Sequence, residues 1–551
     1  MPMSFNRKLA LGLALLLFQG HTMTIGADHI RDLQARAFDV GQAGWGHWGP
    51  RPDLYNSWHN HTNRLIPVYT FGGDLKSYRD SKSLYRKSES LLKLYGRLPR
   101  GTLNPTANYF DQTQLYDLQR RAVAAGKKYL FLVIFDGMDW HTTRSAAIYR
   151  SGKVSYRQGR GAGLSFQDYR GVKTDFGYMV TAPHNVGTVV DPDAQTLSFA
   201  GGTSSGGYHP LLGGSTPWSR PLEAAYLTGA YASWPHPFTD SASSATSMNS
   251  GIKTYNAAVN TTVYGTHVVP LARQLQAQRG FSIGAVTSVP ISHATPACSY
   301  ANNITRRDYQ DLTRDMLGLP SISHPTKALP GLDVLIGAGW GDRLGTDPDQ
   351  GANYVPGNRY ITNRDLRRIE ERYEVVIRTS GQSGSDLLRL GCRRAVEGGR
   401  KLFGYFGTDL AHLPFQTADG RFDPIGSLRD VEVYTPGDVR ENPSLADMTN
   451  AAIRVLEKNT RGFWLMVEAG DVDWANHDNN LDNSIGAVFS GVAAFDAITQ
   501  WAERNKAWDQ TLVIVAADHG HLFFLRDPSA LIDPARAQRA DSRKPPNTQD
   551  P

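Results

Sequence analysis

The sequence predicts an α/β fold built on a largely parallel β-sheet with loop insertions. Apolar runs of strand length recur along the chain, and helical patterns separate several of them. Uninterrupted apolar runs are typical of parallel strands that are covered on both faces. The strands predicted in this way cover residues 129–135, 281–286, 334–336, 402–406, 463–467 and 512–516.

Helices and insertions are expected between these strands. The clearest helix follows Asn483, and a second is predicted between residues 444 and 458. Segments 150–237 and 310–445 are rich in Gly, Pro, Asn and Asp and have poor periodicity, so we expect insertions there. Apolar side chains at helical spacing predict the core-facing side of the first helix: Ile485, Val488, Phe489, Val492, Phe495 and Ile498.

The first 27 residues have the pattern of an export signal. Arg7 and Lys8 precede an apolar run over residues 9–18, and polar and small residues follow it. We therefore expect a periplasmic or extracellular protein, with an uncleaved anchor as the alternative. No later segment predicts a membrane span. The remaining chain is predicted to form an N-terminal extension packed on the core (28–125), a main domain (126–525) and a disordered tail (526–551).

The charge and cysteine content narrow the choice of partners. A formal net charge of +6 favours anionic ligands. Because the arginine pairs are scattered and form no stripe, we expect a small anionic substrate and no nucleic acid specificity. The two cysteines, Cys298 and Cys392, are too few for a disulfide framework, and the sequence leaves open whether they pair.

A candidate nucleophile lies in the segment from Phe238 to Val259. Asp240 and Ser241 are residue types that begin helices, small residues follow them, and Gly251 is a natural stop. Free N–H groups at the start of a helix favour an alkoxide or a bound phosphate. A plain capping role for Ser241 is the alternative reading of this pattern.

Acidic and histidine residues follow four of the predicted strands. Loops at the carboxyl ends of parallel strands converge, so these side chains are expected to meet there and bind metal. Each could instead be a cap, a turn former or a structural histidine. His47, His59 and His61 in the N-terminal segment could also bind metal, but we expect them to be surface or stacking residues. The strand-end residues are Asp136, His293, Thr295, Glu468, Asp473, His477, Asp518, His519 and His521.

The ligand types suggest two kinds of metal site. Carboxylates and imidazoles without thiolates suit zinc, manganese or iron, and an oxygen set such as Asp136, Thr295 and Glu468 suits magnesium. Two divalent ions roughly 4 Å apart would stabilise a phosphoryl displacement, and one could lower the pKa of Ser241. Arg306, expected on a helix, could hold two phosphate oxygens or could be an ordinary surface charge.

Taken together, these motifs resemble the alkaline phosphatase family. The resemblance covers about residues 128–521, and it implies a three-layer α/β/α sandwich and a phosphoserine intermediate. It rests on four segments: residues 239–256 (TDSASSATSMNSGIKTYN), residues 293–297 (HATPA), residues 463–470 (FWLMVEAG) with Asp473 and His477, and residues 517–520 (ADHG).

The resemblance also implies a role for each matching residue. Ser241 would be the nucleophile and Arg306 the phosphate clamp. One zinc would be held by Asp136, Asp518 and His519 with Ser241, and a second by Asp473 and His477. Magnesium would be held by Asp136, Thr295 and Glu468. His293 replaces an acidic residue of some members and would act on the metal through water.

One feature departs from the family pattern. The second zinc of the family takes another histidine from a segment well beyond the Asp-His motif, and no histidine follows His521 in this sequence. We expect His521 itself to point elsewhere. The second zinc site is therefore predicted to be short of one ligand.

These observations predict an exported, metal-dependent phosphomonoesterase that acts through Ser241, with two zinc sites and one magnesium site. The short second site leaves impaired activity open. The family also implies a homodimer. The alternatives are a phosphodiesterase or sulfatase-like hydrolase on the same metal scaffold, or a non-catalytic protein that binds phosphate or metal. The Cys-x-Pro-x-Arg pattern that sulfatases modify is absent from the sequence.

Overall fold

The computed structural model describes residues 28–198, 204–229, 236–424 and 433–533. The predicted export signal and residues 534–551 of the predicted tail lie outside this part. The helices are α1 (His29–Val40), α2 (Ser88–Tyr95), α3 (Gln114–Ala124), α4 (Trp140–Ser151), α5 (Ser165–Asp168), α6 (Pro210–Gly213), α7 (Ala224–Leu227), α8 (Ser241–Ser250), α9 (Leu271–Arg279), α10 (Ala294–Cys298), α11 (Tyr309–Leu317), α12 (Asn363–Ile369), α13 (Gly384–Gly398), α14 (Pro436–Glu441), α15 (Leu445–Leu456), α16 (Asp471–His477) and α17 (Leu481–Arg504).

A ten-stranded sheet runs through the middle of the protein in the order β15-β16-β12-β11-β17-β5-β18-β3-β6-β4. Neighbouring strands from β15 to β18 are parallel, and β3 is antiparallel to both β18 and β6. The predicted parallel sheet is therefore confirmed. Its strands are β3 (Ile66–Phe71), β4 (Phe110–Asp111), β5 (Tyr129–Phe135), β6 (Thr174–Val180), β11 (Ser282–Pro290), β12 (Val334–Ala338), β15 (Tyr373–Ile377), β16 (Lys401–Tyr405), β17 (Phe463–Ala469) and β18 (Thr511–Ala516).

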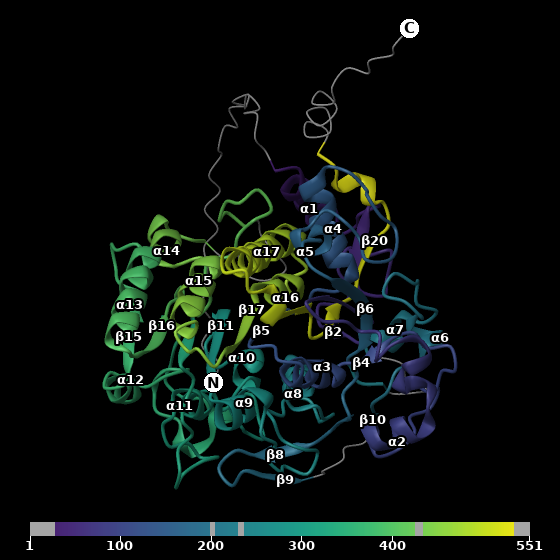
Figure 1. Ribbon diagram of the computed structural model, residues 1–551. Helices are drawn as coiled ribbons and strands as arrows, with labels where there is room; N and C mark the ends of the chain where they lie inside the picture. Colours follow the sequence, from purple (N-terminus) through teal and green to yellow (C-terminus); the bar gives the residue numbers. More distant parts are fainter. Residues whose placement is uncertain (1–27, 199–203, 230–235, 425–432, 534–551) are drawn as a thin grey trace, which may run out of the picture.

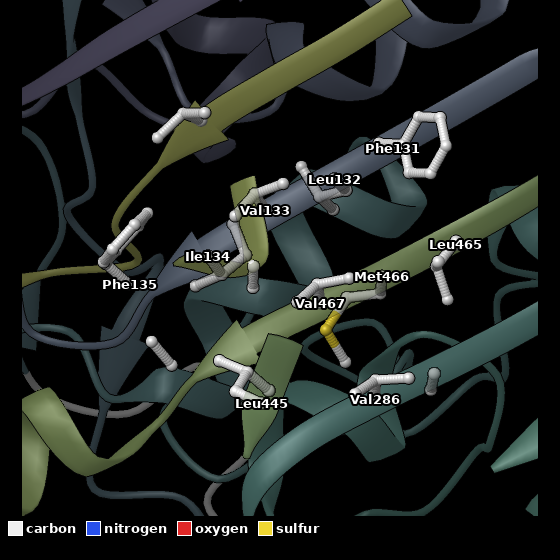
Figure 2. Packing of buried hydrophobic residues seen from close by; sticks show 14 of the residues in the cluster. Phe131, Leu132, Val133, Ile134, Phe135, Val286, Leu445, Leu465, Met466 and Val467 are labelled. Atoms are coloured by element: carbon white, nitrogen blue, oxygen red, sulfur yellow. The ribbon is translucent and has the colours of Figure 1, made fainter. Parts of the chain in front are cut away.

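Helices cover both faces of this sheet, which gives the three-layer arrangement (Figure 1). On one face α15 packs against α13, α17 and strands β11 and β12. On the other, α8 packs against α3, α9 and α10. The central strands are buried on both faces, and Figure 2 shows side chains of β5, β17 and β11 packed in the core.

The long helix α17 has the packing face that the sequence predicts. Ile485, Val488, Val492, Phe495 and Ile498 are buried, and Phe489 is half-buried at its edge. Among the described residues, α17 is the one helix long and apolar enough to cross a membrane. Within the protein 72% of its most apolar stretch is buried, as in the core helix of a soluble domain.

The N-terminal segment enters the sheet itself. β3 lies between β18 and β6, although residues 28–125 were expected to pack on the core as an extension. Three short strand pairs tie the two ends of the described chain together: β1 (Gly46–Trp48) pairs with β20 (Phe523–Leu525), β2 (His61–Thr62) with β19 (Gly520–His521), and β3 with β18.

Other expectations are also modified by the structure. β6 belongs to the central sheet although it lies in the predicted insertion at 150–237. The start of the predicted tail is folded, because η5 (Pro528–Leu531) buries Leu531. Cys298 and Cys392 are buried free thiols, so they do not pair.

The remaining short elements are the pairs β7 (Asn185–Val186) with β10 (Ser204–Ser205), β8 (Val189–Asp191) with β9 (Thr196–Ser198) and β13 (Arg343–Leu344) with β14 (Gly357–Asn358), and the 3-10 helices η1 (Asp80–Lys82), η2 (Leu84–Arg86), η3 (Pro348–Asn353) and η4 (Trp508–Gln510).

Candidate active site and metal centre

Ser241 is the first residue of α8 and is almost fully buried. Asp240 caps this helix, since its carboxylate accepts a hydrogen bond from the Ser243 N–H at 2.9 Å. The helix ends at Gly251, whose left-handed backbone (φ 70°) suits glycine. The Ser241 Oγ lies 3.2 Å from His519 Nε2, so the predicted nucleophile faces a predicted metal ligand.

Residues from four neighbouring strands of the sheet meet beside Ser241. Asp136 follows β5, Glu468 lies near the end of β17, and Asp518 follows β18. Thr295 lies in α10, after β11. Because β11, β17, β5 and β18 are adjacent and parallel, their carboxyl ends open at the same edge of the sheet.

The first candidate metal site consists of Asp136, Asp518 and His519, whose ligand atoms lie within 4.8 Å of one another. His519 Nε2 is 3.2 Å from Asp136 Oδ1 and 3.4 Å from Asp518 Oδ2. Both of these carboxylate oxygens are buried and receive no hydrogen bond. Two carboxylates and one imidazole meet here, and no hydrogen-bond donor satisfies the facing carboxylate oxygens. Such a set of side chains fits a divalent cation such as zinc.

The electrostatics of this edge also fit bound cations. Burial raises the pKa of Asp136 well above its usual range, and the neighbouring carboxylates of Asp518, Asp473 and Glu468 raise it further. Burial raises the pKa of Glu468 to about 7, although the hydrogen bond from the Thr287 hydroxyl opposes the shift. Crowded carboxylates repel one another, and divalent cations remove that repulsion. The Thr295 hydroxyl and Glu468 Oε1 are both buried without a hydrogen-bond partner, and the magnesium set of Asp136, Thr295 and Glu468 stays a prediction.

The second candidate site is built on α16. Asp473 and His477 are four residues apart on the same face of this helix, and His477 Nε2 is 3.4 Å from Asp473 Oδ2. His61, Asp473, His519 and His521 also form a cluster of potential ligand atoms within 4.8 Å.

Our expectation that His521 points elsewhere is wrong. His521 Nε2 lies 2.7 Å from Asp473 Oδ1. Residues 519 and 521 are two apart in extended backbone, and side chains with that spacing point to the same side of a strand.

His61 was expected at the surface or in a stack; the stack is present, but the expected surface position is wrong. It is buried in this cluster, and its ring stacks on His519 with centroids 3.7 Å apart. Its strand β2 is only two residues long, so no local pattern marked it.

Arg306 and His293 lie side by side next to the nucleophile helix. Arg306 is in a turn before α11 and not on a helix as expected, because its N–H donates to the Ala257 carbonyl at 2.7 Å. Its guanidinium contacts Asp240 Oδ2 at 3.2 Å and His293 Nε2 at 3.3 Å. Burial lowers the pKa of His293 to about 3, and Arg306 lowers it further. The role of His293 as a metal ligand stays a prediction.

Comparisons with known proteins identify relatives of this chain. A family model for alkaline phosphatase matches residues 222–369 and 423–540. Alkaline phosphatase 4 of Bacillus subtilis is 28% identical over 297 residues, which cover 53% of this chain and 52% of the relative. Escherichia coli alkaline phosphatase is 28% identical over 316 residues, which cover 54% and 63%. The chain thus spans about half the length of the first of these relatives.

Solved structures with similar folds include two alkaline phosphatases. The Thermus thermophilus protein has a TM-score of 0.43 and 22% identity, with 72% of this chain and 60% of that chain covered. A cold-active enzyme from a psychrophilic Shewanella has a TM-score of 0.41 and 18% identity, with 71% and 68% covered.

Proposed function

Because the chain belongs to the alkaline phosphatase family, we propose that it hydrolyses phosphate monoesters through a phosphoserine at Ser241. The observation that carries the proposal is the position of the Ser241 Oγ, which starts a helix and lies 3.2 Å from His519 in the first metal site. A serine at a helix N-terminus beside convergent metal ligands is suited to attack phosphorus.

The proposed reaction has two displacements at phosphorus. In the first, the Ser241 Oγ forms a bond to phosphorus, the bond to the ester oxygen breaks, and the leaving alcohol takes up a proton. In the second, water attacks the phosphoserine, and phosphate and the serine hydroxyl are released. Divalent cations in these sites would lower the pKa of the hydroxyl and neutralise charge on the phosphoryl oxygens.

The protein's own groups would position the phosphate. The helix N-terminus at Ser241 would favour a bound phosphate, although Asp240 already accepts from the Ser243 and Ser244 N–H groups. Arg306 would donate two parallel hydrogen bonds to non-bridging oxygens, and its contact with Asp240 orients the guanidinium. Two zinc ions at the Asp136 and Asp473 sites and one magnesium ion at Glu468 and Thr295 are part of the proposal.

The test is hydrolysis of a chromogenic phosphate monoester across pH, before and after chelation and after zinc and magnesium are restored. We expect activity at alkaline pH that chelation abolishes and metal restores, because the ligands bind metal only when deprotonated. An acid-quenched reaction should contain protein that carries one phosphate on Ser241. Activity that is indifferent to chelation, faster cleavage of diesters or sulfate esters, or phosphate binding without turnover would each overturn the proposal.

Export and dimerisation are further proposals. Export is supported by Arg7, Lys8 and the apolar run that follows them. Fractionation of expressing cells tests it, and protein retained in the cytoplasm would contradict it. The homodimer rests on the family resemblance alone, and light scattering of the purified protein tests it.

A further inference from the structure

The second metal site has a ligand candidate from the N-terminal part of the chain. His61 lies in β2, and the pairing of this strand with β19 places His61 directly opposite His521. Only 7% of His61 is exposed, although it is a polar residue on a two-residue strand. Stacking on His519 fixes the plane of its ring.

The donor atoms of this site are spaced like those around one metal ion. His61 Nε2 is 3.0 Å from His477 Nε2 and 3.5 Å from Asp473 Oδ1. His477 Nε2 is 3.4 Å from Asp473 Oδ2. Ligands about 2.0–2.1 Å from a tetrahedral zinc ion lie about 3.3 Å from each other. The three side chains are therefore close to the spacing that one zinc ion requires, with one Asp473 oxygen next to each imidazole.

The Nδ1 atoms of His61 and His477 each donate a hydrogen bond to a backbone carbonyl, and these bonds support the assignment. His61 Nδ1 lies 3.1 Å from the Thr239 carbonyl, and His477 Nδ1 lies 2.6 Å from the His59 carbonyl. A carbonyl only accepts, so each Nδ1 carries the hydrogen and each neutral ring keeps a lone pair on Nε2. These two lone pairs face each other at 3.0 Å, which is unfavourable unless a cation lies between them. A ring N–H bonded to a backbone carbonyl is also the usual support of a metal-binding histidine.

We propose that His61 is a ligand of the second zinc ion, together with Asp473 and His477. The inference rests on the metal centre of the proposed function and supplies the ligand that its second site was predicted to lack. The order along the chain is unusual, because this ligand precedes the Asp-His motif and does not follow it. His521 has a different role: its Nε2 donates to Asp473 and orients the carboxylate, which makes it a positioning residue.

Metal binding to His61→Ala tests the proposal directly. The full-length protein is stripped with a chelator and titrated with Co²⁺ for the visible absorption of tetrahedral cobalt, and with Zn²⁺ in competition with a chromophoric chelator. We expect the variant to lose one metal equivalent, or to bind it more than about 100-fold more weakly. His521→Ala should lose less, about 10- to 100-fold, as an outer-shell substitution does.

His59→Ala is the matched control. It removes an exposed imidazole two residues away and retains the carbonyl that accepts from His477. The variant is expected to bind metal as the wild type does. If His61→Ala binds the same number of ions with the affinity of His59→Ala, the proposal is wrong. A larger loss in His521→Ala than in His61→Ala would make His521 the ligand and also overturn it.

Two further measurements separate the ligand role from misfolding and from activity. The metal-free forms of the wild type and His61→Ala should melt at similar temperatures, whereas zinc should stabilise the wild type more. His61→Cys, which retains a ligand atom, should recover cobalt binding that His61→Ala lacks, and failure of this recovery counts against the proposal. Because metal is counted without turnover, a loss of binding in His61→Ala supports the ligand role even if no ester is hydrolysed.

Discussion

A buried ion pair attaches the segment that carries His61 to the rest of the protein, and its loss can be tested by thermal unfolding. Arg64 and Asp139 form an ion pair with side-chain exposures of 2% and 0% and an Nη1 to Oδ2 distance of 2.6 Å. Arg64 Nη1 also contacts the Phe523 carbonyl at 3.2 Å. Asp139 caps α4 and lies three residues after Asp136, which follows β5. Arg64 thus joins the N-terminal segment to both α4 and the C-terminal strand β20.

Replacing Arg64 by Met should be costly because it leaves the Asp139 carboxylate buried without a counter-ion. Removing one partner of a buried ion pair costs about 3–5 kcal/mol of unfolding free energy. A chain of 551 residues has an unfolding entropy of about 1.2 kcal/mol/K at roughly 2.1 cal/mol/K per residue. The expected fall in melting temperature is therefore about 3–4 °C.

The assay is calorimetry of the chelated protein, so that metal binding does not contribute. Arg51→Met is the control, since Arg51 and Asp53 form an exposed pair (63% and 57%) that solvent screens, so its loss should leave the melting temperature nearly unchanged. Adding Asp139→Asn to Arg64→Met should recover most of the loss, because it removes the orphaned charge. If Arg64→Met melts no lower than Arg51→Met, the buried pair is not the anchor that we describe.

The stability deficit of Arg64→Met should depend on pH, and the direction of this dependence follows from the pKa of Asp139. Burial already raises the pKa of Asp139 in the wild type. Without Arg64 this pKa rises further, so the folded variant binds a proton more tightly than the unfolded chain does. The stability deficit of Arg64→Met should therefore shrink as pH falls from 8 toward 5. A deficit that grows over this range would refute the reasoning.

Three further predictions concern the active site. Ser241→Ala should lower phosphate ester turnover by about 10³-fold or more while metal content stays constant, and a rate near that of the wild type would exclude Ser241 as nucleophile. Arg306→Ala should lower kcat/KM by about 10- to 100-fold through lost charge-assisted hydrogen bonds, with Arg306→Lys in between; equal rates for all three proteins would show that Arg306 does not hold the phosphate. Because the pKa of Glu468 is raised to about 7 without metal, Mg²⁺ must displace a proton below that pH. Its affinity in calorimetric titrations should fall about tenfold per pH unit below 7 and level off above it, whereas a pH-independent affinity would contradict this account.

Much of the fold could be predicted because the central strands are buried on both faces. Such strands leave uninterrupted apolar runs, as in β5 and β17, and a run of this kind can be recognised without knowledge of the fold. β3 and β6 were missed for a different reason. The apolar pattern of β3 (IPVYTF) is interrupted by Pro67 and Thr70, and β6 begins with the polar, half-buried residues Thr174 and Asp175. Their place in the sheet depends on pairing with distant strands.

The site residues also fall into two groups: those that the order of the strands brings together, and those that meet only through pairing of distant segments. Asp136, Glu468 and Asp518 could be placed together because they follow neighbouring parallel strands, so their meeting is a consequence of the sheet. His61 enters through the pairing of β2 with β19, which joins residues more than 400 positions apart. No periodicity or spacing encodes such a contact. The orientation of His521 could have been predicted from the alternation of side chains in a strand.

The arrangement of the second site links metal binding to the pairing of the chain's distant segments. Asp473 and His477 lie on one helix, whereas His61 reaches them only when β1, β2 and β3 have paired with β20, β19 and β18. The unfolded chain cannot hold these three side chains together without closing a loop of about 400 residues, which carries a large entropic cost. A metal ion that uses His61 therefore binds the folded state almost exclusively, and it stabilises the attachment of the N-terminal segment to the sheet by the free energy of its own binding.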